Sequence, residues 1–246
     1  MPLTPARVLR TFRYGVLLDG VDDFGSVRDS PSLKPAVLTV GAWVNIPRYP
    51  TDWLTNKIVR KANEYSPYTG FWLDITPTTR TFRFSANSIS THYSVFGATV
   101  PALGRWYNPV GVFDGSRLYI YVNGVLDAPP VSGAYDPYDI DLWIGRFGNH
   151  YLNCIISEVF MYNRALSDEE NWWNYENPDD LVADGLVLSL YAHPNNIQDI
   201  DNDGILEWID LSGHGNHGKI YGARLVELVK EPARVLSPAR VLAPAR

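Results

Sequence analysis

The sequence contains little sulfur, which limits how the fold can be stabilised. Its 246 residues include one cysteine and two methionines. A single cysteine cannot form a disulfide within the chain, so disulfide bonds play no part in holding the fold together. Cys154 lies in the apolar run CIISEVF, where we expect a buried and unreactive thiol.

The sequence also lacks a long apolar stretch and a recognisable targeting segment. A membrane-spanning helix needs about 20 consecutive apolar residues. No such run occurs, so we expect no membrane insertion. Residues 1–16 show neither the apolar core nor the small-residue cleavage site of a secretion signal. We expect an extracellular or surface-exposed protein whose signal has been removed, or a virion component made without one, and the initial Met favours the second.

Positive charge is scarce. The chain holds 21 Lys and Arg against 27 Asp and Glu, which gives a formal net charge of −6. A surface that binds nucleic acid needs clustered positive charge to displace the counterions of the phosphates. We therefore expect no nucleic-acid partner.

Aromatic residues are abundant, with 15 Tyr, 8 Trp and 9 Phe. Aromatic and β-branched side chains pack best on the pleated surface of a sheet, so this composition favours strands. Short apolar or alternating runs between turn signals are typical of a β-sandwich. Such runs are found at residues 36–45, 79–85, 107–115, 117–126, 140–147 and 154–163. The sequence predicts an all-β fold.

Two kinds of local signal mark the connections between these runs. Asp114-Gly115 and Asn123-Gly124 supply the positive φ that tight hairpin turns require, so the runs beside them are expected to be antiparallel neighbours. Ser167, followed three residues later by Glu170, forms a capping box. This is the one convincing start of a helix in the sequence.

Several segments, taken in order, resemble one known family. The segments LLDGVDDFGSVRDSPSL, LTVGAWVNIP, GRWYNPVGVFDGSRLYIYVNGVL and LWIGRFGNHYLNCIISEVFMYNRALSDEE are similar to the LamG-like jelly rolls of the concanavalin A-like lectin/glucanase superfamily. The resemblance covers about residues 14–176. It implies a two-sheet antiparallel jelly-roll sandwich, often a carbohydrate-binding or adhesion module, often with calcium at its rim and usually non-catalytic. Phe160 stands where such strands often carry a charged residue, which suggests that the outer face there is covered by a partner or by the protein's own tail.

The expected organisation has four parts. They are an N-terminal arm (1–13), the LamG-like jelly-roll domain (14–176), a C-terminal segment (177–230) and an extended tail that repeats Pro-Ala-Arg-Val-Leu (231–246). Regularly spaced prolines exclude a helix in the tail, which is either disordered or an arm that docks on a neighbour. Residues 185–223 resemble a segment that precedes the domain in many members of the family. This segment therefore completes either its own sandwich or that of a neighbouring copy, which would link a homo-oligomer head to tail.

The stretch DIDNDGILEWID has the spacing of a twelve-residue calcium loop. Carboxylates at alternate positions surround one hard cation, and Gly204 at the sixth position allows the sharp turn. The last position is Asp rather than Glu and no second helix follows, so the loop resembles dockerin-like and thrombospondin-type repeats more than a signalling EF-hand. The expected calcium ligands are Asp199, Asp201, Asp203, the carbonyl group of Ile205, Glu207 and Asp210. The alternative is an exposed acidic turn.

A second acidic group lies at the expected rim of the sandwich. The resemblance to the family raises a metal site at Asp19, Asp22 and Asp23, together with Glu158. The motif DGVDD is equally typical of a polar turn between two strands, because Asp side chains accept hydrogen bonds from nearby backbone amides. Both interpretations stay open from the sequence.

Two aromatic and polar loops could bind sugar. An aromatic ring can stack on the apolar face of a pyranose, while planar polar groups bond its hydroxyls. The candidate residues are Trp53, Asn56, Asn63, Glu64, Tyr65 and Tyr68, with Trp72 as a further stacking residue. The alternative is that these aromatic residues belong to the core. Phe71 and Trp72 are adjacent and must point to opposite faces, so both cannot lie in one site.

No catalytic motif is found. The glucanases of the superfamily place their acid and nucleophile in a Glu-x-Asp-x-x-Glu strand, which is missing here, as are Gly-x-Ser-x-Gly and His-Glu-x-x-His. We expect no enzyme. The leading interpretation is a calcium-stabilised, lectin-like module that recognises glycans or a glycosylated surface. The alternative is a structural protein of a virion or surface appendage that uses the same fold as a building block.

Overall fold

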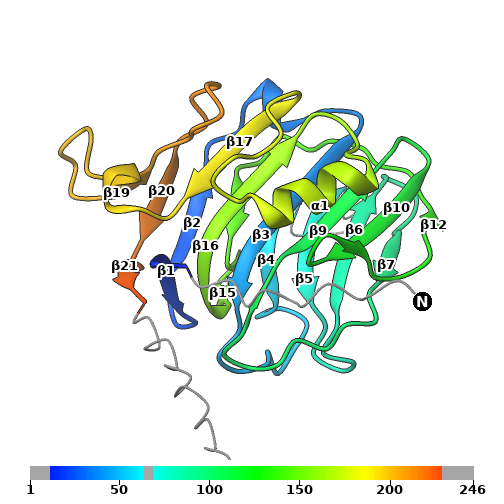
Figure 1. Cartoon of the computed structure of the whole chain (residues 1–246), viewed down its shortest axis with the longest axis horizontal. Coiled ribbons are helices and arrows are strands. Elements are labelled where there is room, and N and C mark those ends of the chain that lie inside the picture. The colour runs from blue at the N-terminus through cyan, green and yellow to red at the C-terminus, as the bar shows by residue number, and fades with distance from the viewer. Residues whose placement is uncertain (1–11, 64–68, 229–246) are drawn as a thin grey trace, which may run out of the picture.

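The structure is a computed structural model, and it describes residues 12–63 and 69–228. Two large antiparallel sheets, called sheet A and sheet B, lie face to face and enclose the core (Figure 1). This is the two-sheet antiparallel jelly-roll sandwich of the concanavalin A-like type that the sequence predicts. The alternation of buried and outward side chains along the strands produces this arrangement, because each sheet has one apolar face to cover.

Sheet A is formed around the long strand β16. Its hydrogen-bonded order among the described residues is β11 (Val125–Leu126), β10 (Arg117–Val122), β9 (Pro109–Phe113), β3 (Leu38–Asn45), β16 (Asn153–Tyr162), β1 (Tyr14–Asp19) and β21 (Arg224–Glu227). Three further strands pair off this path, namely β12 (Val131–Ser132) with β10, β17 (Leu186–Tyr191) with β16 and β8 (Trp106–Tyr107) with β3.

Sheet B forms the opposite layer. Its order is β18 (Ile197–Gln198), β19 (Leu206–Trp208), β20 (Gly218–Tyr221), β2 (Phe24–Val27), β13 (Leu142–Ile144), β4 (Lys57–Ala62), β5 (Gly70–Ile75), β6 (Phe82–Asn87) and β7 (Ser94–Phe96). The short pair β14 (Arg146–Phe147) and β15 (His150–Tyr151) stands apart from both large sheets.

One α-helix and two short 3-10 helices accompany the strands in the described part of the chain. They are α1 (Asp168–Glu176), η1 (Pro31–Leu33) and η2 (Pro194–Asn196). The predicted capping box at the start of α1 is confirmed, with the Ser167 side chain accepting from the Glu170 amide and the Glu170 carboxylate accepting from the Ser167 amide. Neither α1 nor the 3-10 helices have the length and apolar character needed to cross a bilayer.

The core fills the space between the two sheets. In β5 the side chains of Phe71, Leu73 and Ile75 are fully buried among residues of both sheets, and Trp72 and Asp74 alternate with them on the outer face. The predicted separation of Phe71 from Trp72 is therefore confirmed. The thiol of Cys154 also lies in the core, and burial raises its pKa, as expected for an unreactive cysteine.

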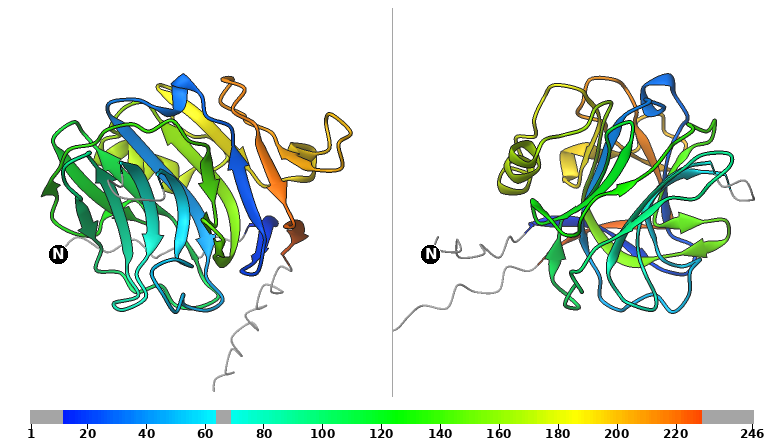
Figure 2. Two further views of the ribbon diagram at one scale, coloured as in Figure 1. Left: turned by 180° about the vertical axis from the view of Figure 1, so that it is seen from behind. Right: turned by 90° about the vertical axis from the view of Figure 1, so that its right-hand side faces the viewer.

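The chain's own residues 163–186 cover part of the outer face of sheet A. Phe160 is 1% exposed and belongs to a second apolar cluster with Leu166, against which Leu181 and Leu186 pack. Figure 2 shows α1 outside sheet A, on the side away from sheet B. The cover that the sequence suggests for Phe160 is thus supplied by the protein's own segment after β16.

The C-terminal segment pairs with strands of the same chain. Strand β17 adds to β16, β20 joins sheet B through β2, and β21 pairs with β1 in sheet A. The strands β18, β19 and β20 therefore extend sheet B beyond β2, as Figure 1 shows at the left of the molecule. Residues 1–11 of the predicted N-terminal arm and the whole of the predicted repeat tail (231–246) lie outside the described residues.

Asp210 fixes this segment to the domain. Its carboxylate accepts hydrogen bonds from the backbone amides of Ser189, Ser212 and Asn216, at 2.9, 3.0 and 2.9 Å, and from the Ser212 hydroxyl at 2.8 Å. Asn216 in turn donates to the carbonyl group of Val187. Because these donors are largely buried, the carboxylate satisfies groups that would otherwise cost free energy.

Candidate functional site

The outer face of sheet B carries a continuous array of charged and aromatic side chains. Directly paired residues on neighbouring strands point to the same face of a sheet. The first row runs through Glu207, Lys219, Ser26, Trp143, Arg60, Trp72 and Ser85. The second row runs through Lys57, Asp74, Arg83 and Phe96. Since Leu73 and Phe84, which alternate with these residues, are buried in the core, both rows face outward.

A groove opens over these rows at β4, β5 and β6. It has a volume of about 310 Å³, and we call it the sheet B groove. The residues that line it are Trp53, Leu54, Lys57, Arg60, Trp72, Arg83, His92 and Phe147. This volume is at the lower end of the range found for small-molecule sites. The lining combines broad aromatic surfaces with cationic groups.

The cations of the groove lie against aromatic rings. The guanidinium carbon of Arg83 is 4.8 Å from the ring centroid of Trp53 and 6.0 Å from that of Trp72. The guanidinium carbon of Arg60 lies 4.4 Å from the ring of Phe147. Cation–π attraction of this kind stabilises the charged groups and holds the rings in fixed orientations. The groove is therefore largely preformed.

Asp74 connects two of these cations. Its fully buried carboxylate accepts from Lys57 Nζ at 3.0 Å and from two nitrogens of Arg83 at 3.0 and 2.6 Å. Lys57 Nζ also donates to the carbonyl group of Trp53 at 2.9 Å and to Asn56 Oδ1 at 2.5 Å. Burial lowers the pKa of Lys57, and the nearby Asp74 carboxylate opposes that shift.

The structure places only some of the residues predicted to bind sugar in the groove. Trp53 lines the groove and is 43% exposed. Asn56 is fully buried and accepts a hydrogen bond from Lys57, so it positions Lys57 without lining the groove itself. The backbone carbonyl group of Asn63 accepts a hydrogen bond from the Arg60 guanidinium group. The remaining predicted residues, Glu64, Tyr65 and Tyr68, lie outside the described residues.

Sequence reasoning missed every cationic residue of the groove. Lys57, Arg60, Arg83, His92 and Phe147 line it but were not among the candidates. The alternation in the strand TFRFS could have indicated Arg83, because Arg83 stands between Phe82 and Phe84 and must face away from the core. Phe147 reaches the groove from a separate hairpin, and no local pattern predicts that.

The acidic loop between β18 and β19 brings together only some of its predicted ligands. Asp199, Asp201 and Glu207 offer carboxylate oxygens that lie within 4.8 Å of one another. Asp203 stands beside them, and Ile205 donates its backbone amide to the Asp203 carboxylate at 2.8 Å. Asp210, the ligand predicted at the twelfth position of the loop, points elsewhere. Its carboxylate accepts from the four donors that fix the C-terminal segment.

Lys219 lies on this acidic group from the neighbouring strand β20. Its ammonium nitrogen is 3.2 Å from an oxygen of Asp201, 2.5 Å from one of Asp203 and 3.3 Å from one of Glu207. Hydrogen bonds to Asp203 and Asp201 raise the pKa of Lys219 well above its ordinary value. The same bond with Lys219 holds the pKa of Asp203 below its ordinary value. An internal cation thus balances carboxylates that could also hold a metal.

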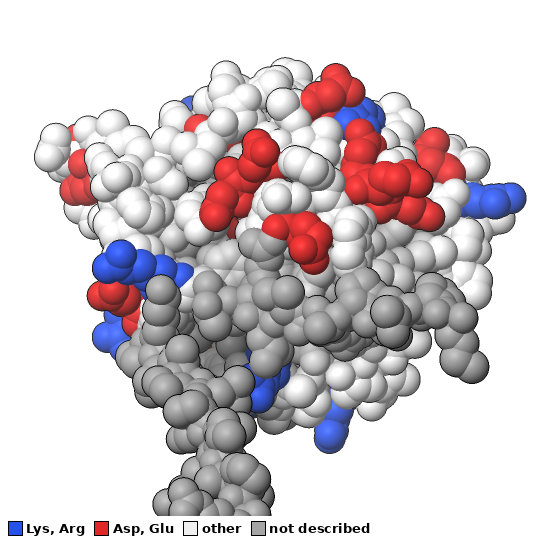
Figure 3. Space-filling model, in the orientation of Figure 1, with Lys and Arg blue, Asp and Glu red and all other residues white. Residues whose placement is uncertain are grey.

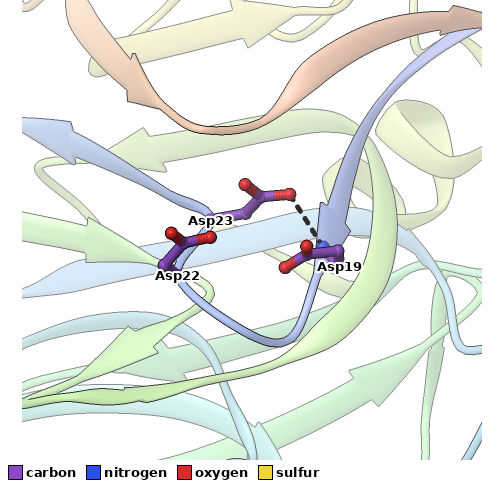
Figure 4. A group of neighbouring side chains, drawn as sticks. All are labelled: Asp19, Asp22 and Asp23. Carbon is purple, nitrogen blue, oxygen red and sulfur yellow. Dashed lines mark hydrogen bonds between the residues drawn. The ribbon is translucent and has the colours of Figure 1, made fainter.

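A second acidic cluster lies in the turn between β1 and β2. Figure 4 shows Asp19, Asp22 and Asp23 around this turn, with the Asp19 amide donating to Asp23 Oδ2 at 2.9 Å. Burial raises the pKa of Asp23. Glu158, which was predicted to join this group, is not part of the cluster and lies buried in β16. The hydrogen bond within the turn matches the expected polar turn, and the three carboxylates are also close enough to hold a metal.

Charges are distributed unevenly over the molecule. Figure 3 shows Asp and Glu side chains gathered on the face that carries α1. The first turn of this helix alone contributes Asp168, Glu169 and Glu170. The groove on the opposite layer is lined instead by cationic side chains. The chain therefore has a local cationic site on sheet B although its net charge is negative.

Three solved structures share this fold at low sequence identity. A Bacteroides ovatus protein whose proposed role is carbohydrate binding is 17% identical with a TM-score of 0.65, covering 88% of this chain and 60% of that chain. The native heptameric SAP-like pentraxin of Limulus polyphemus is 14% identical with a TM-score of 0.51, covering 73% of this chain and 86% of that chain. The sialidase of Trypanosoma rangeli in complex with the inhibitor DANA is 17% identical with a TM-score of 0.51. The match covers 67% of this chain and 28% of the sialidase chain. The chain thus spans 60% of the length of the Bacteroides protein.

These likenesses show the fold alone, and because a sialidase shares it, the fold does not decide between binding and catalysis. No curated protein matches the chain. The family model described as the concanavalin A-like lectin/glucanases superfamily matches residues 19–170, which is more than half of the chain. The chain therefore belongs to the concanavalin A-like lectin/glucanases superfamily.

Proposed function

We propose that the protein is a non-catalytic recognition module that binds glycans in the sheet B groove. The observation that carries this proposal is the arrangement of Trp53, Trp72 and Phe147 around one groove. Aromatic rings stack on the apolar face of a pyranose, and the charged and polar groups between them can bond its hydroxyls. Since the rings are held by cation–π contacts, little conformational entropy is lost when a sugar binds.

The described residues that line the groove do not include the carboxyl pair of most glycoside hydrolases. Most such enzymes use two carboxyl groups that flank the scissile bond, one of which acts as the general acid. Within the described part of the groove, the nearest carboxylate is Asp74, which is fully buried and bonded to Lys57 and Arg83. The described residues that line the groove include no carboxyl group that could flank a bound sugar. This favours binding over catalysis.

Calcium is the second part of the proposal. Asp199, Asp201 and Glu207 are close enough for their oxygens to surround one hard cation, which fits the oxygen ligands that calcium prefers. In our proposal calcium displaces the ammonium group of Lys219 from Asp201 and Glu207 and ties β19 to the loop before it. Because Glu207 and Lys219 lie in the same row as Arg60 and Trp72, this loop is the acidic end of the face that holds the groove.

A glycan array tests the proposed function. The wild-type protein and two variants, Trp53→Ala and Trp72→Ala, are applied to the same array. We expect the wild type to bind a defined set of glycans and both variants to bind them at least about fivefold more weakly, since stacking on one ring contributes about 1 kcal/mol or more. The matched control is Trp173→Ala, because Trp173 is 48% exposed and lies on α1, on the other side of the sandwich. Binding by both groove variants equal to that of the wild type would contradict the proposal.

A further inference from the structure

The charges around Asp74 do not cancel. The ammonium group of Lys57 and the guanidinium group of Arg83 both bond to this single carboxylate, so two positive charges meet one negative charge. The other groups that accept from Lys57 Nζ are the neutral carbonyl oxygen of Trp53 and the neutral amide oxygen of Asn56. These acceptors satisfy the hydrogen bonds of Lys57 without removing its charge. The centre formed by Lys57, Asp74 and Arg83 therefore carries a net charge of about +1.

This centre lies in surroundings that strengthen its field. The side chains of Lys57, Arg83 and Asp74 are only 8%, 12% and 0% exposed, so water screens them poorly. The rings of Trp53 and Trp72 stand over Arg83 and border the same groove. A charge interacts more strongly with an opposite charge in such a low-dielectric environment than in water. An anion that entered the groove would meet a fixed, unbalanced positive charge.

The lowered pKa of Lys57 agrees with this picture. Burial disfavours the charged ammonium group, and one carboxylate shared with Arg83 compensates only in part. A second anion beside Lys57 and Arg83 would relieve that cost. A fully neutral sugar would leave the imbalance as it is.

We propose that the sheet B groove selects saccharides whose ring carries a carboxylate, such as uronic acids. The inference rests on the proposed function and goes beyond it by naming the class of ligand. The ring stacks on Trp53 and Trp72, and its carboxylate accepts from the guanidinium N–H groups of Arg83 that Asp74 does not use. The three donors of Lys57 are already taken, so Lys57 contributes its charge and no hydrogen bond. The volume of about 310 Å³ suits one acidic ring at this position, with the rest of a glycan chain extending along the face of the sheet.

Matched pairs of saccharides test the selection. Each pair consists of a uronic acid oligosaccharide and its carboxyl-reduced neutral counterpart, taken from the gluco, galacto and manno series. Calorimetric titration of the wild-type protein should show about tenfold or greater preference for the acidic member of at least one pair, as expected for a charge-assisted hydrogen bond. Raising the sodium chloride concentration from about 50 mM to about 500 mM should weaken binding of the acidic member and leave the neutral one nearly unchanged.

A charge-removing variant identifies the groups responsible. In Arg83→Gln the centre keeps Lys57 and Asp74, whose charges sum to about zero, so the ratio of the affinities for the acidic and the neutral member should fall to about one. Loss of the contact between Arg83 and Trp53 weakens both members alike and leaves this ratio informative. The control is Arg105→Gln, which makes the same change in net charge at an exposed residue that does not line the groove. This control should keep the preference.

The outcomes separate the two proposals. Equal affinity for both members of every pair, lost in Trp53→Ala, would overturn the selection for carboxylates and leave glycan binding in the groove intact. Absence of binding to any member would overturn the selection for uronic acids, whereas the proposed function would be overturned only if the glycan array also showed no binding that depends on Trp53 and Trp72. If Arg83→Gln fails to fold, the salt dependence of the wild type still decides, because acidic binding that does not respond to salt contradicts an electrostatic origin.

Discussion

Arg83 donates two hydrogen bonds to the carboxylate of Asp74, its direct cross-strand partner between β5 and β6. The paired geometry fixes the plane of the guanidinium group and thereby the position of the Trp53 ring that lies 4.8 Å from it. The same carboxylate holds Lys57. One buried acid thus organises both the cations and an aromatic wall of the groove.

The first prediction concerns the stability that Asp74 contributes. Asp74→Asn leaves Lys57 and Arg83 buried without a counter-charge, and breaking a buried ion pair typically costs about 3–5 kcal/mol. Urea unfolding should show a loss of that size in the free energy of unfolding. The control, Asp139→Asn, removes an acid whose side chain is 86% exposed in its pair with Lys34, and it should change the free energy of unfolding by about 1 kcal/mol or less. Similar losses in both variants would contradict the role given to Asp74.

The second prediction concerns calcium and Lys219. Lys219→Met removes the internal cation from Asp201, Asp203 and Glu207 but keeps a side chain of similar length. The variant should bind calcium about tenfold more tightly than the wild type, because the metal no longer competes with the ammonium group. Calorimetric titration with calcium measures both affinities. Asp201→Ala should abolish the binding heat, and a wild type and Lys219→Met that both give no heat would eliminate the metal site.

The third prediction separates Asp210 from the acidic loop. Asp210→Ala leaves the buried amides of Ser189 and Asn216 without an acceptor, which should lower the free energy of unfolding by about 3 kcal/mol. Asp201→Ala, at a residue whose side chain is 56% exposed, should cost about 1 kcal/mol or less in the absence of calcium. If Asp210→Ala were as mild as Asp201→Ala, Asp210 would not be the anchor of the C-terminal segment.

The fourth prediction is a pH dependence at the start of α1. The hydrogen bonds from Arg164 hold the pKa of Glu170 below its ordinary value of 4.5. A carboxyl group with a depressed folded-state pKa stabilises the fold above its unfolded pKa, and that contribution is lost as the pH falls through the folded value. Glu170→Gln keeps the capping box but not the ion pair. The difference in melting temperature between wild type and variant should therefore shrink from about pH 6 to about pH 3, and a difference independent of pH would refute this cause.

Local features of the fold could be predicted from the sequence because their signals are local. The turn at Asn123-Gly124 has the predicted positive φ values of 54° and 74° and connects β10 to β11. The capping box needs only Ser167 and Glu170. The family resemblance supplied the arrangement of the two sheets, which such local patterns do not contain.

The candidate site was harder to predict because it depends on the register between distant strands. Arg60 and Trp72 are neighbours only through the pairing of β4 with β5. Lys219 reaches the acidic loop only because it is the partner of Glu207 across β19 and β20. The spacing of carboxylates in the loop is visible in the sequence, whereas the cation that balances them comes from another strand.

The most direct test of carboxylate-selective glycan binding is a crystal structure of the protein with the tightest-binding saccharide of the array. We predict a sugar ring stacked on Trp53 and Trp72, with its carboxylate within hydrogen-bonding distance of the Arg83 guanidinium group. A sugar bound elsewhere, for example beside Asp19 and Asp22 at the rim, with nothing in the sheet B groove, would contradict it.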